Sequence, residues 1–280
     1  MGRRIKDWSL WIVILVILAG LAILVWAIIT NSRNILEAFG WITGAVIPAT
    51  IFIFDQLHKR NLRLFLFTNK LRSLLSKRAP TWNLSVLMQG EQVTEKSIDQ
   101  ITKKLLELRS DTSDTKVMRF DANSSTVYIR SLPPIEITFT PTMQSPIPEL
   151  GDKEFPSIKI SMRSFRVGYA QSSVAIQDDI SPILESIAGT IQDTETRYSL
   201  VIDFDKDKNP FYGLYIANLP PETISKFSIL LVFNNQGQKD TVAISESKVA
   251  INARTQTALK RLALNFLTFD PKLEGLLRHA

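Results

Sequence analysis

Two long apolar runs near the start of the chain constrain its fold more than any other feature. Residues 8–30 contain no charged side chain, and residues 35–54 contain only one, Glu37. As a helix the first run is about 34 Å long, enough to cross a hydrocarbon core of about 30 Å. The link between the runs is so short that the two helices must be antiparallel. The sequence therefore predicts a transmembrane helical hairpin over residues 1–54.

The basic residues around these runs indicate how the hairpin is oriented. Three precede the first run, several follow the second, and Arg33 alone lies between them. By the positive-inside rule both termini face the cytoplasm, which makes the chain a two-pass membrane protein. A cleaved signal peptide fits less well, because no A-x-A-like site follows the first run. The basic residues that we expect at the anionic membrane surface are Lys59, Arg60, Arg63, Lys70, Arg72, Lys77 and Arg78.

Residues 55–80 read as a basic amphipathic connector helix that continues from the hairpin. The helix either lies on the headgroups or forms a bundle with other copies. In the second apolar run, Gly40 and Gly44 have the spacing that lets two membrane helices approach closely, either within the hairpin or between copies. Together these features predict a homo-oligomer. The predicted oligomerisation residues are Gly40, Gly44, Leu57, Leu64, Phe67, Leu71 and Leu74.

Beyond residue 80 the pattern changes to short strands and amphipathic helices. We expect strands near residues 82–88, 116–120, 125–131, 135–140, 158–169, 198–204, 211–217, 227–233 and 240–245, and helices over 95–109, 181–192 and 255–268. Ser181 and Pro182 have the residue types of a helix start, and a slip in the alternation of 158–169 suggests a bulge or a bend. These elements predict a cytosolic α+β domain over residues 81–280 with a mostly antiparallel sheet. The proline-rich stretch 141–156 would separate two lobes.

The residues that commonly carry catalysis are scarce. The chain has no cysteine and two histidines, His58 and His279, which leaves little for a zinc site or a Ser-His-Asp triad. Asp203, Asp205 and Asp207 are spaced like the start of a calcium loop, but the later ligands are missing and a hairpin turn explains them better. We therefore predict no enzymatic activity, no metal and no cofactor.

Several arginine and tyrosine residues in the strands of the second half would suit a binding role. If cationic and aromatic residues converge on one sheet face, arginine would bind phosphate and tyrosine would stack on a base, which suits a nucleotide ligand. The same residues are also explained as exposed faces and core edges. The candidates are Arg163, Arg166, Arg197, Tyr198, Tyr212 and Tyr215. Direct DNA binding is not expected, because residues 81–280 hold 22 basic and 24 acidic residues.

The plan of an almost charge-free hairpin over residues 8–54, a connector to residue 80 and a domain without catalytic residues resembles the two-transmembrane effectors of bacterial antiphage defence. The resemblance is one of architecture. It implies a sensor and effector of the bacterial inner membrane, whose domain recognises a ligand or partner and whose hairpins oligomerise to perturb the bilayer. The alternative is a non-catalytic membrane scaffold that tethers a cytosolic protein complex.

Overall fold

The structure is a computed structural model that describes residue 48 and residues 51–52, 64–68, 79–108, 115–130, 132–141, 155–205, 209–212, 228–235 and 238–268. The chain divides into two compact units, residues 1–68 with 213–219 and residues 69–212 with 220–280. Most of the predicted hairpin and connector lies outside the described residues, so both stay predictions. Among the described residues no helix is long and apolar enough to cross a membrane.

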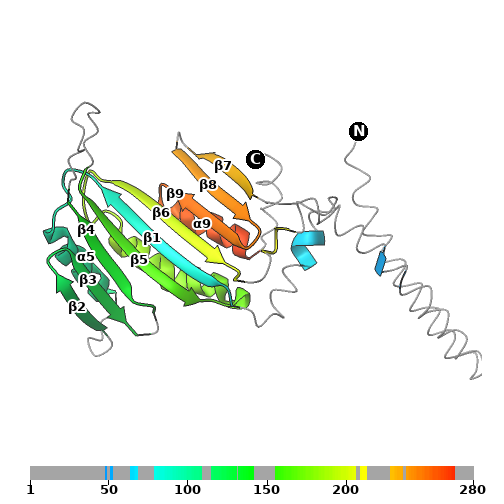
Figure 1. Cartoon of the computed structure of the whole chain (residues 1–280), viewed down its shortest axis with the longest axis horizontal. Coiled ribbons are helices and arrows are strands. Elements are labelled where there is room, and N and C mark those ends of the chain that lie inside the picture. The colour runs from blue at the N-terminus through cyan, green and yellow to red at the C-terminus, as the bar shows by residue number, and fades with distance from the viewer. Residues whose placement is uncertain are drawn as a thin grey trace, which may run out of the picture. The chain divides into compact units, whose positions relative to one another are not determined.

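The second unit is built on a nine-stranded antiparallel sheet (Figure 1). This confirms the expectation of a mostly antiparallel sheet accompanied by helices. The strands lie in the order β2-β3-β4-β5-β1-β6-β9-β8-β7. Their bounds are β1 Thr81–Gln89, β2 Thr115–Asp121, β3 Ser124–Ile129, β4 Ile135–Thr140, β5 Ser157–Arg166, β6 Glu195–Asp203, β7 Ser228–Asn235, β8 Gln238–Ser245 and β9 Lys248–Ala253.

The chain follows the same route through both halves of this sheet. From the central strand β1, helix α5 (Lys96–Glu107) leads to the edge strand β2, and the strands from β2 to β5 return step by step to β1. From β6, on the other side of β1, the chain reaches the opposite edge at β7 and returns through β8 and β9. The stretch 141–156 connects β4 and β5, which are neighbours in one continuous sheet.

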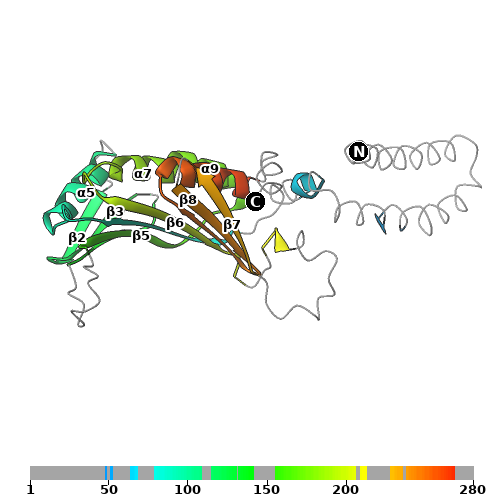
Figure 2. The same cartoon turned by 90° about the horizontal axis from the view of Figure 1, so that it is seen from above.

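Helices cover one face of the sheet and leave the other open (Figure 2). On β1 the alternate side chains of Trp82, Leu84, Val86 and Met88 are buried on the covered face. Helix α9 (Gln256–Leu267) begins at Thr255, whose hydroxyl accepts a hydrogen bond from the Ala258 backbone N–H. This cap and a buried apolar stripe confirm the helix predicted over 255–268. Its buried residues include Leu259, Leu262, Ala263 and Phe266.

The helix expected to start at Ser181 begins earlier. Helical structure runs from α6 (Ser172–Val174) through a π-helical turn, η5 (Ala175–Ile180), into α7 (Ser181–Ile187). Pro182 has no N–H to donate, and its ring crowds the preceding turn, which a wider π-helical turn can accommodate. The Ser181 hydroxyl donates to the Ile176 carbonyl at 2.7 Å instead of capping a helix. The prediction of a helix start at Ser181 was therefore wrong.

The predicted phase slip in residues 158–169 is confirmed as a bulge in β5. The register between β1 and β5 shifts by one residue between Trp82 and Leu84. Opposite this shift Ser164 adopts a positive φ of 55°, and its N–H donates to the Asn83 side-chain oxygen at 2.9 Å. The extra residue returns Phe165 to the covered face, where its ring centroid lies 5.9 Å from that of Trp82.

In the C-terminal half one strand prediction fails and one strand was not predicted, for a common reason. The segment 211–217 cannot pair with β6 as expected, because β1 and β9 occupy both edges of β6. Phe211 and Tyr212 instead lie in a turn, in which the Tyr212 N–H donates to the Asn209 carbonyl at 3.1 Å. The neighbours of β6 are β1 and β9, and β9 is a six-residue strand that the sequence pattern did not reveal. Strand neighbours are set by long-range packing, which alternation alone does not encode.

Candidate functional site

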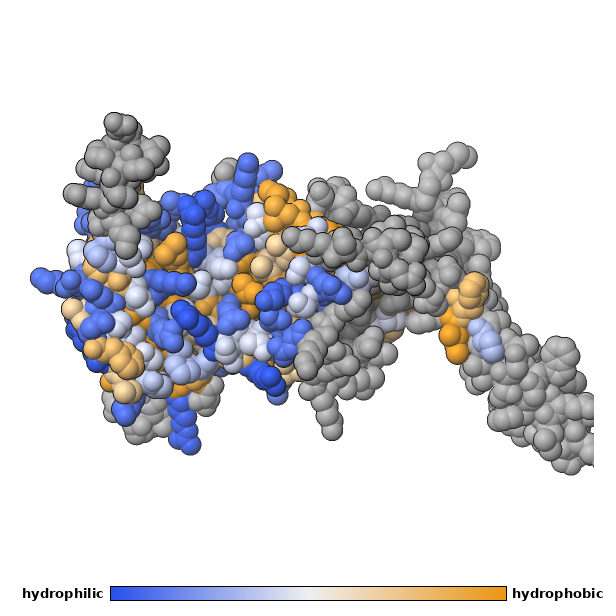
Figure 3. Space-filling view, viewed as in Figure 1, coloured by the Kyte–Doolittle hydropathy of each residue, from blue (hydrophilic) through white to orange (hydrophobic). Residues whose placement is uncertain are grey.

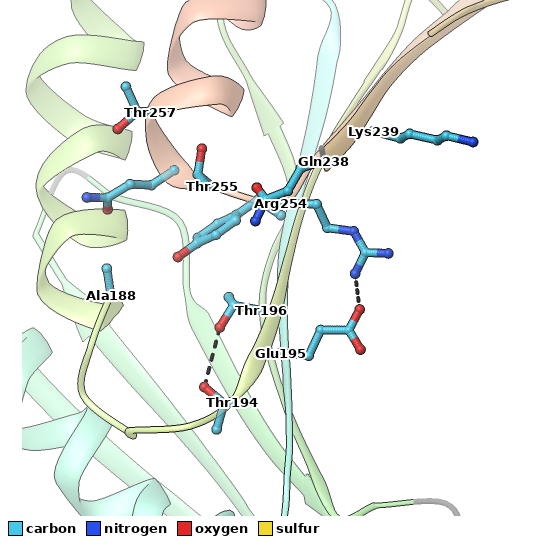
Figure 4. Close-up of a pocket in the computed structure, with 11 residues that line it drawn as sticks. Ala188, Thr194, Glu195, Thr196, Gln238, Lys239, Arg254, Thr255 and Thr257 are labelled. Atoms are coloured by element: carbon cyan, nitrogen blue, oxygen red, sulfur yellow. Dashed lines mark hydrogen bonds and ion pairs between the residues drawn. The ribbon is translucent and has the colours of Figure 1, made fainter. Parts of the chain in front are cut away.

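A cavity of about 790 Å³ lies where β6 begins and α9 starts (Figure 4). Its size falls in the range of small-molecule sites. Four of its lining residues are threonines, so we call it the threonine cavity. It is lined by Ala188, Thr194, Glu195, Thr196, Tyr198, Gln238, Lys239, Arg254, Thr255, Gln256 and Thr257.

The helix-facing side of the threonine cavity is lined by polar side chains. Tyr198 is 4% exposed and is one of the residues that line this cavity. Burial raises the pKa of this phenol, which keeps it a neutral donor. The Thr255 hydroxyl accepts from the Ala258 N–H at 3.1 Å, so its own proton remains available to a ligand. The side-chain oxygen of Gln256 is buried and has no hydrogen-bond partner among the described residues.

The opposite side of the strand ends carries a charged cluster. The Glu195 carboxylate accepts a hydrogen bond from Arg197 at 3.0 Å and another from Arg254 (Figure 4). These two guanidinium groups hold the pKa of Glu195 below its usual range. Lys239 points away from this pair (Figure 4). One carboxylate is thus shared by two cations, which leaves the cluster with a positive balance.

The predicted arginines share the open face of the sheet, which Figure 3 shows as largely hydrophilic. Arg163 forms an ion pair with Glu136 at 3.4 Å, and Arg166 forms one with Asp205 at 3.7 Å. Arg197 also lies on this face, in the next-but-one strand from β5. All three are well exposed, so the ion pairs contribute little to stability. The arginines are available to a partner that covers this face.

The predicted tyrosines do not join the arginines. Tyr198 belongs to the covered face, because it alternates with Arg197 and pairs with Val86. Tyr212 is 6% exposed and lies in the turn after Asn209. Tyr215 lies outside the described residues. The geometry therefore separates the arginine surface from Tyr198, which belongs to the threonine cavity.

A second cavity, of about 500 Å³, lies at the other end of the sheet. Most of its lining is apolar, with Arg166, Gln171 and Asp179 as the polar exceptions. Asp179 belongs to the π-helical turn η5. Near this cavity the Val167 N–H donates to the Pro80 carbonyl at 3.3 Å, so this end of the sheet is the one that the connector joins.

The aspartates near residue 205 form a turn. The Asp205 N–H donates to the Asp203 carboxylate at 3.0 Å, and Asp205 has a positive φ of 54°. The Lys248 ammonium lies 2.8 Å from the same Asp203 carboxylate, which raises the pKa of Lys248. No group of three or more potential metal-ligating side chains occurs within the described part of the chain.

Few of the predicted membrane-surface and oligomerisation residues can be placed. Leu64 is half-buried, and Phe67 is 64% exposed in a helical segment that also contains the buried Phe65. The remaining predicted residues lie outside the described part: Gly40, Gly44, Leu57, Lys59, Arg60, Arg63, Lys70, Leu71, Arg72, Leu74, Lys77 and Arg78.

Sequence reasoning found Tyr198 and Arg197 but missed the threonines and Arg254. The lining comes from segments that are distant along the chain, namely the end of α7, the start of β6, the start of β8 and the start of α9. A Thr-x-Thr pattern occurs at 194–196 and 255–257, but also at 138–140 and 140–142, so the pattern alone does not identify the cavity. No known protein family matches this sequence, and a comparison with curated proteins finds no match.

Proposed function

We propose that this chain is a membrane-anchored sensor and effector. Its domain binds a small ligand in the threonine cavity, and its predicted hairpin self-associates to perturb the bilayer, in a role such as antiphage defence. The polar lining of the cavity, with the buried side-chain oxygen of Gln256, supports a ligand-binding role. The domain acts by binding rather than by catalysis.

One observation carries this proposal: β1 spans the distance between the connector and the cavity. Its first residue, Thr81, directly follows Pro80 at the end of the connector. Its last residue, Gln89, pairs with Glu195 at the threonine cavity. Nine residues of strand cover about 27 Å. A single central strand, hydrogen-bonded on both sides, thus joins the ligand cavity to the segment that leads into the predicted membrane hairpin.

The test is expression of the full chain in bacteria, with growth and membrane potential as readouts. The wild type should depolarise the membrane under inducing conditions. Substituting Gly40→Ile and Gly44→Ile should abolish depolarisation while the protein still inserts, because branched side chains keep the helix backbones apart. Replacing residues 1–54 by an unrelated two-span hairpin should also abolish it. Full activity after that replacement would contradict the effector proposal.

The open sheet face favours a second candidate, a scaffold that holds a protein complex at the membrane. Arg163, Arg166 and Arg197 are exposed there, and arginine is enriched at protein interfaces. For a scaffold, Arg163→Glu and Arg166→Glu should release a co-purifying partner, and the hairpin replacement should have no effect. For the effector, the same two substitutions should leave depolarisation unchanged.

A further inference from the structure

We infer that β7, the last strand of the sheet, pairs with β7 of a second copy of this chain. The two strands would run antiparallel about a two-fold axis and join both sheets into one continuous sheet. The inference goes beyond the proposed function, which assigns self-association to the predicted membrane hairpin. It rests on the edge strand itself and does not require that proposal.

β7 is an edge strand without the features that usually prevent edge pairing. Of the described strands only β8 pairs with it, and the register from Ser228↔Ser245 to Asn235↔Gln238 contains no shift. Its eight residues, SILLVFNN, include no charged residue, no proline and no glycine. An edge strand presents unpaired backbone N–H and C=O groups, and natural proteins usually block such edges with charges, proline or bulges. The regular, uncharged β7 therefore offers a backbone on which another strand can pair.

The opposite edge of the same sheet is protected. β2 carries the charged residues Lys116, Arg119 and Asp121, and its register with β3 shifts between Arg119 and Asp121. The Arg119 guanidinium also forms an ion pair with Asp99 at 2.8 Å. β2 exposes apolar side chains too, such as Phe120, but a strand added there would meet charges and an irregular end. Of these two edges, only β7 combines exposed apolar side chains with a regular, uncharged backbone.

The side chains that β7 presents on the open face are apolar. Leu230 is 63% exposed and Val232 is 42% exposed, and they form an apolar patch on a largely hydrophilic face (Figure 3). A row of apolar residues leads across the sheet to this patch, because Leu230 pairs with Ala243, Ala243 with Ala250, and Ala250 with Val201. The occupant of this edge is therefore an apolar strand rather than a charged one.

A second copy meets this requirement, because β7 is complementary to itself. With the two-fold axis at Leu231, each apolar residue lies opposite an apolar residue of the second copy, and each polar residue opposite a polar one. The opposed pairs are Leu230 with Val232, Ile229 with Phe233, and Ser228 with Asn234. Opposed residues also point to the same face, so both open faces lie on one side of the joined sheet. Anchoring in the same membrane would raise the effective concentration of the second copy.

The experiment is disulfide crosslinking of the full chain in bacterial membranes, which is clean because the chain contains no cysteine. Leu231→Cys places one thiol at the proposed axis, opposite the same residue of the second copy and within disulfide reach. The matched control is Met118→Cys on the protected edge strand β2. Under a mild oxidant, Leu231→Cys should form a covalent dimer about tenfold faster than Met118→Cys. Equal rates, or no dimer from Leu231→Cys, overturn the inference.

Two exposed positions test the register. Chains with Leu230→Cys and chains with Val232→Cys should form more covalent dimer when co-expressed than when either is expressed alone. The reason is that these two residues lie directly opposite each other across the axis, whereas each lies only diagonally from its own copy. No increase on co-expression contradicts the register on which the inference rests.

A charge placed on the edge should prevent the pairing. In the Leu231→Cys chain, Val232→Lys should reduce the covalent dimer about tenfold, because lysine on an edge strand blocks the addition of another strand. The matched control is Val117→Lys on β2, where the valine is similarly exposed, at 39% against 42%. This control should leave the dimer unchanged, and circular dichroism checks that both variants fold. A crosslink that survives Val232→Lys overturns the inference.

Two further outcomes are decisive. An intramolecular crosslink between Leu231→Cys and Ile216→Cys, without a covalent dimer, would show that the same chain covers the edge, and it overturns the inference. A chain that depolarises membranes without crosslinking through β7 overturns this inference alone. A chain that crosslinks through β7 but never depolarises a membrane overturns the effector role alone.

Discussion

The two faces of the sheet differ in almost every property, although the same strands form both. On the covered face, large apolar side chains such as Trp82 and Met88 are at most 1% exposed. On the open face, small and polar side chains lie side by side across six strands. This row consists of Glu136, Ser161, Ser85, Ser199, Asn252 and Thr241.

This difference indicates that the covered face stabilises the domain, whereas the open face is available for binding. The covered face removes apolar area from water, which is the main favourable contribution to folding. The open face gains little from burial, so its residues are free to serve a partner. The threonine cavity lies at the ends of the strands, where lining residues come from both faces. Its polar groups are partly buried, which strengthens a hydrogen bond to a ligand, and they remain accessible to that ligand.

The largest expected difference between the two faces is in the stability of variants at two adjacent residues of β1. Leu84→Ala on the covered face should destabilise the domain by about 2–5 kcal/mol, because it removes buried methyl groups and leaves a cavity. Ser85→Ala, one residue further on the open face, should change stability by about 0.5 kcal/mol or less. Urea denaturation of the detergent-solubilised full chain measures both. Similar losses for the two variants would show that the open face is packed against something.

A smaller difference in stability is expected when two asparagines, one buried and one on the open face, are replaced by alanine. Asn209 is 2% exposed, and its side-chain oxygen accepts from the N–H groups of Phe211 and Tyr212 at 2.8 and 2.9 Å. Asn209→Ala should cost about 2 kcal/mol, because the two buried N–H groups would lose the side-chain oxygen that they share, although the Tyr212 N–H also donates to the backbone carbonyl of residue 209. Asn252→Ala on the open face should be nearly neutral. Thermal unfolding of both variants measures the difference, and equal melting temperatures would contradict it.

The smallest effect concerns pH and the exposed Glu195. Its pKa is depressed in the folded state by Arg197 and Arg254. The ion pair therefore stabilises the domain above the ordinary pKa of about 4.5, and this contribution is lost as the pH falls through the lower folded-state pKa. Glu195→Gln should flatten the loss of melting temperature between neutral and acidic pH. A slope identical to that of the wild type would show that the pairing is not retained in solution.

Local patterns predicted much of the domain, and the reason is visible in particular residues. The alternation of Tyr198, Leu200 and Ile202 predicted β6, and the spacing of Leu259, Leu262 and Phe266 predicted α9. Both depend only on the period of apolar residues within one element. The threonines of the cavity were missed because a polar residue at the end of an element has no such period. Their proximity exists only in the folded domain.

The sequence by itself determined which side chains of each strand face the core, and it predicts a membrane hairpin through two apolar runs. Tertiary structure decided which strands are neighbours: it placed β9 beside β6, excluded 211–217 from that edge and inserted a π-helical turn before Pro182. It also brought Tyr198, Arg254 and Thr255 to one cavity. The physical reason is the separation along the chain of the residues that interact. Side-chain alternation is a property of adjacent residues, whereas strand order and cavities arise from packing between segments that are distant along the chain.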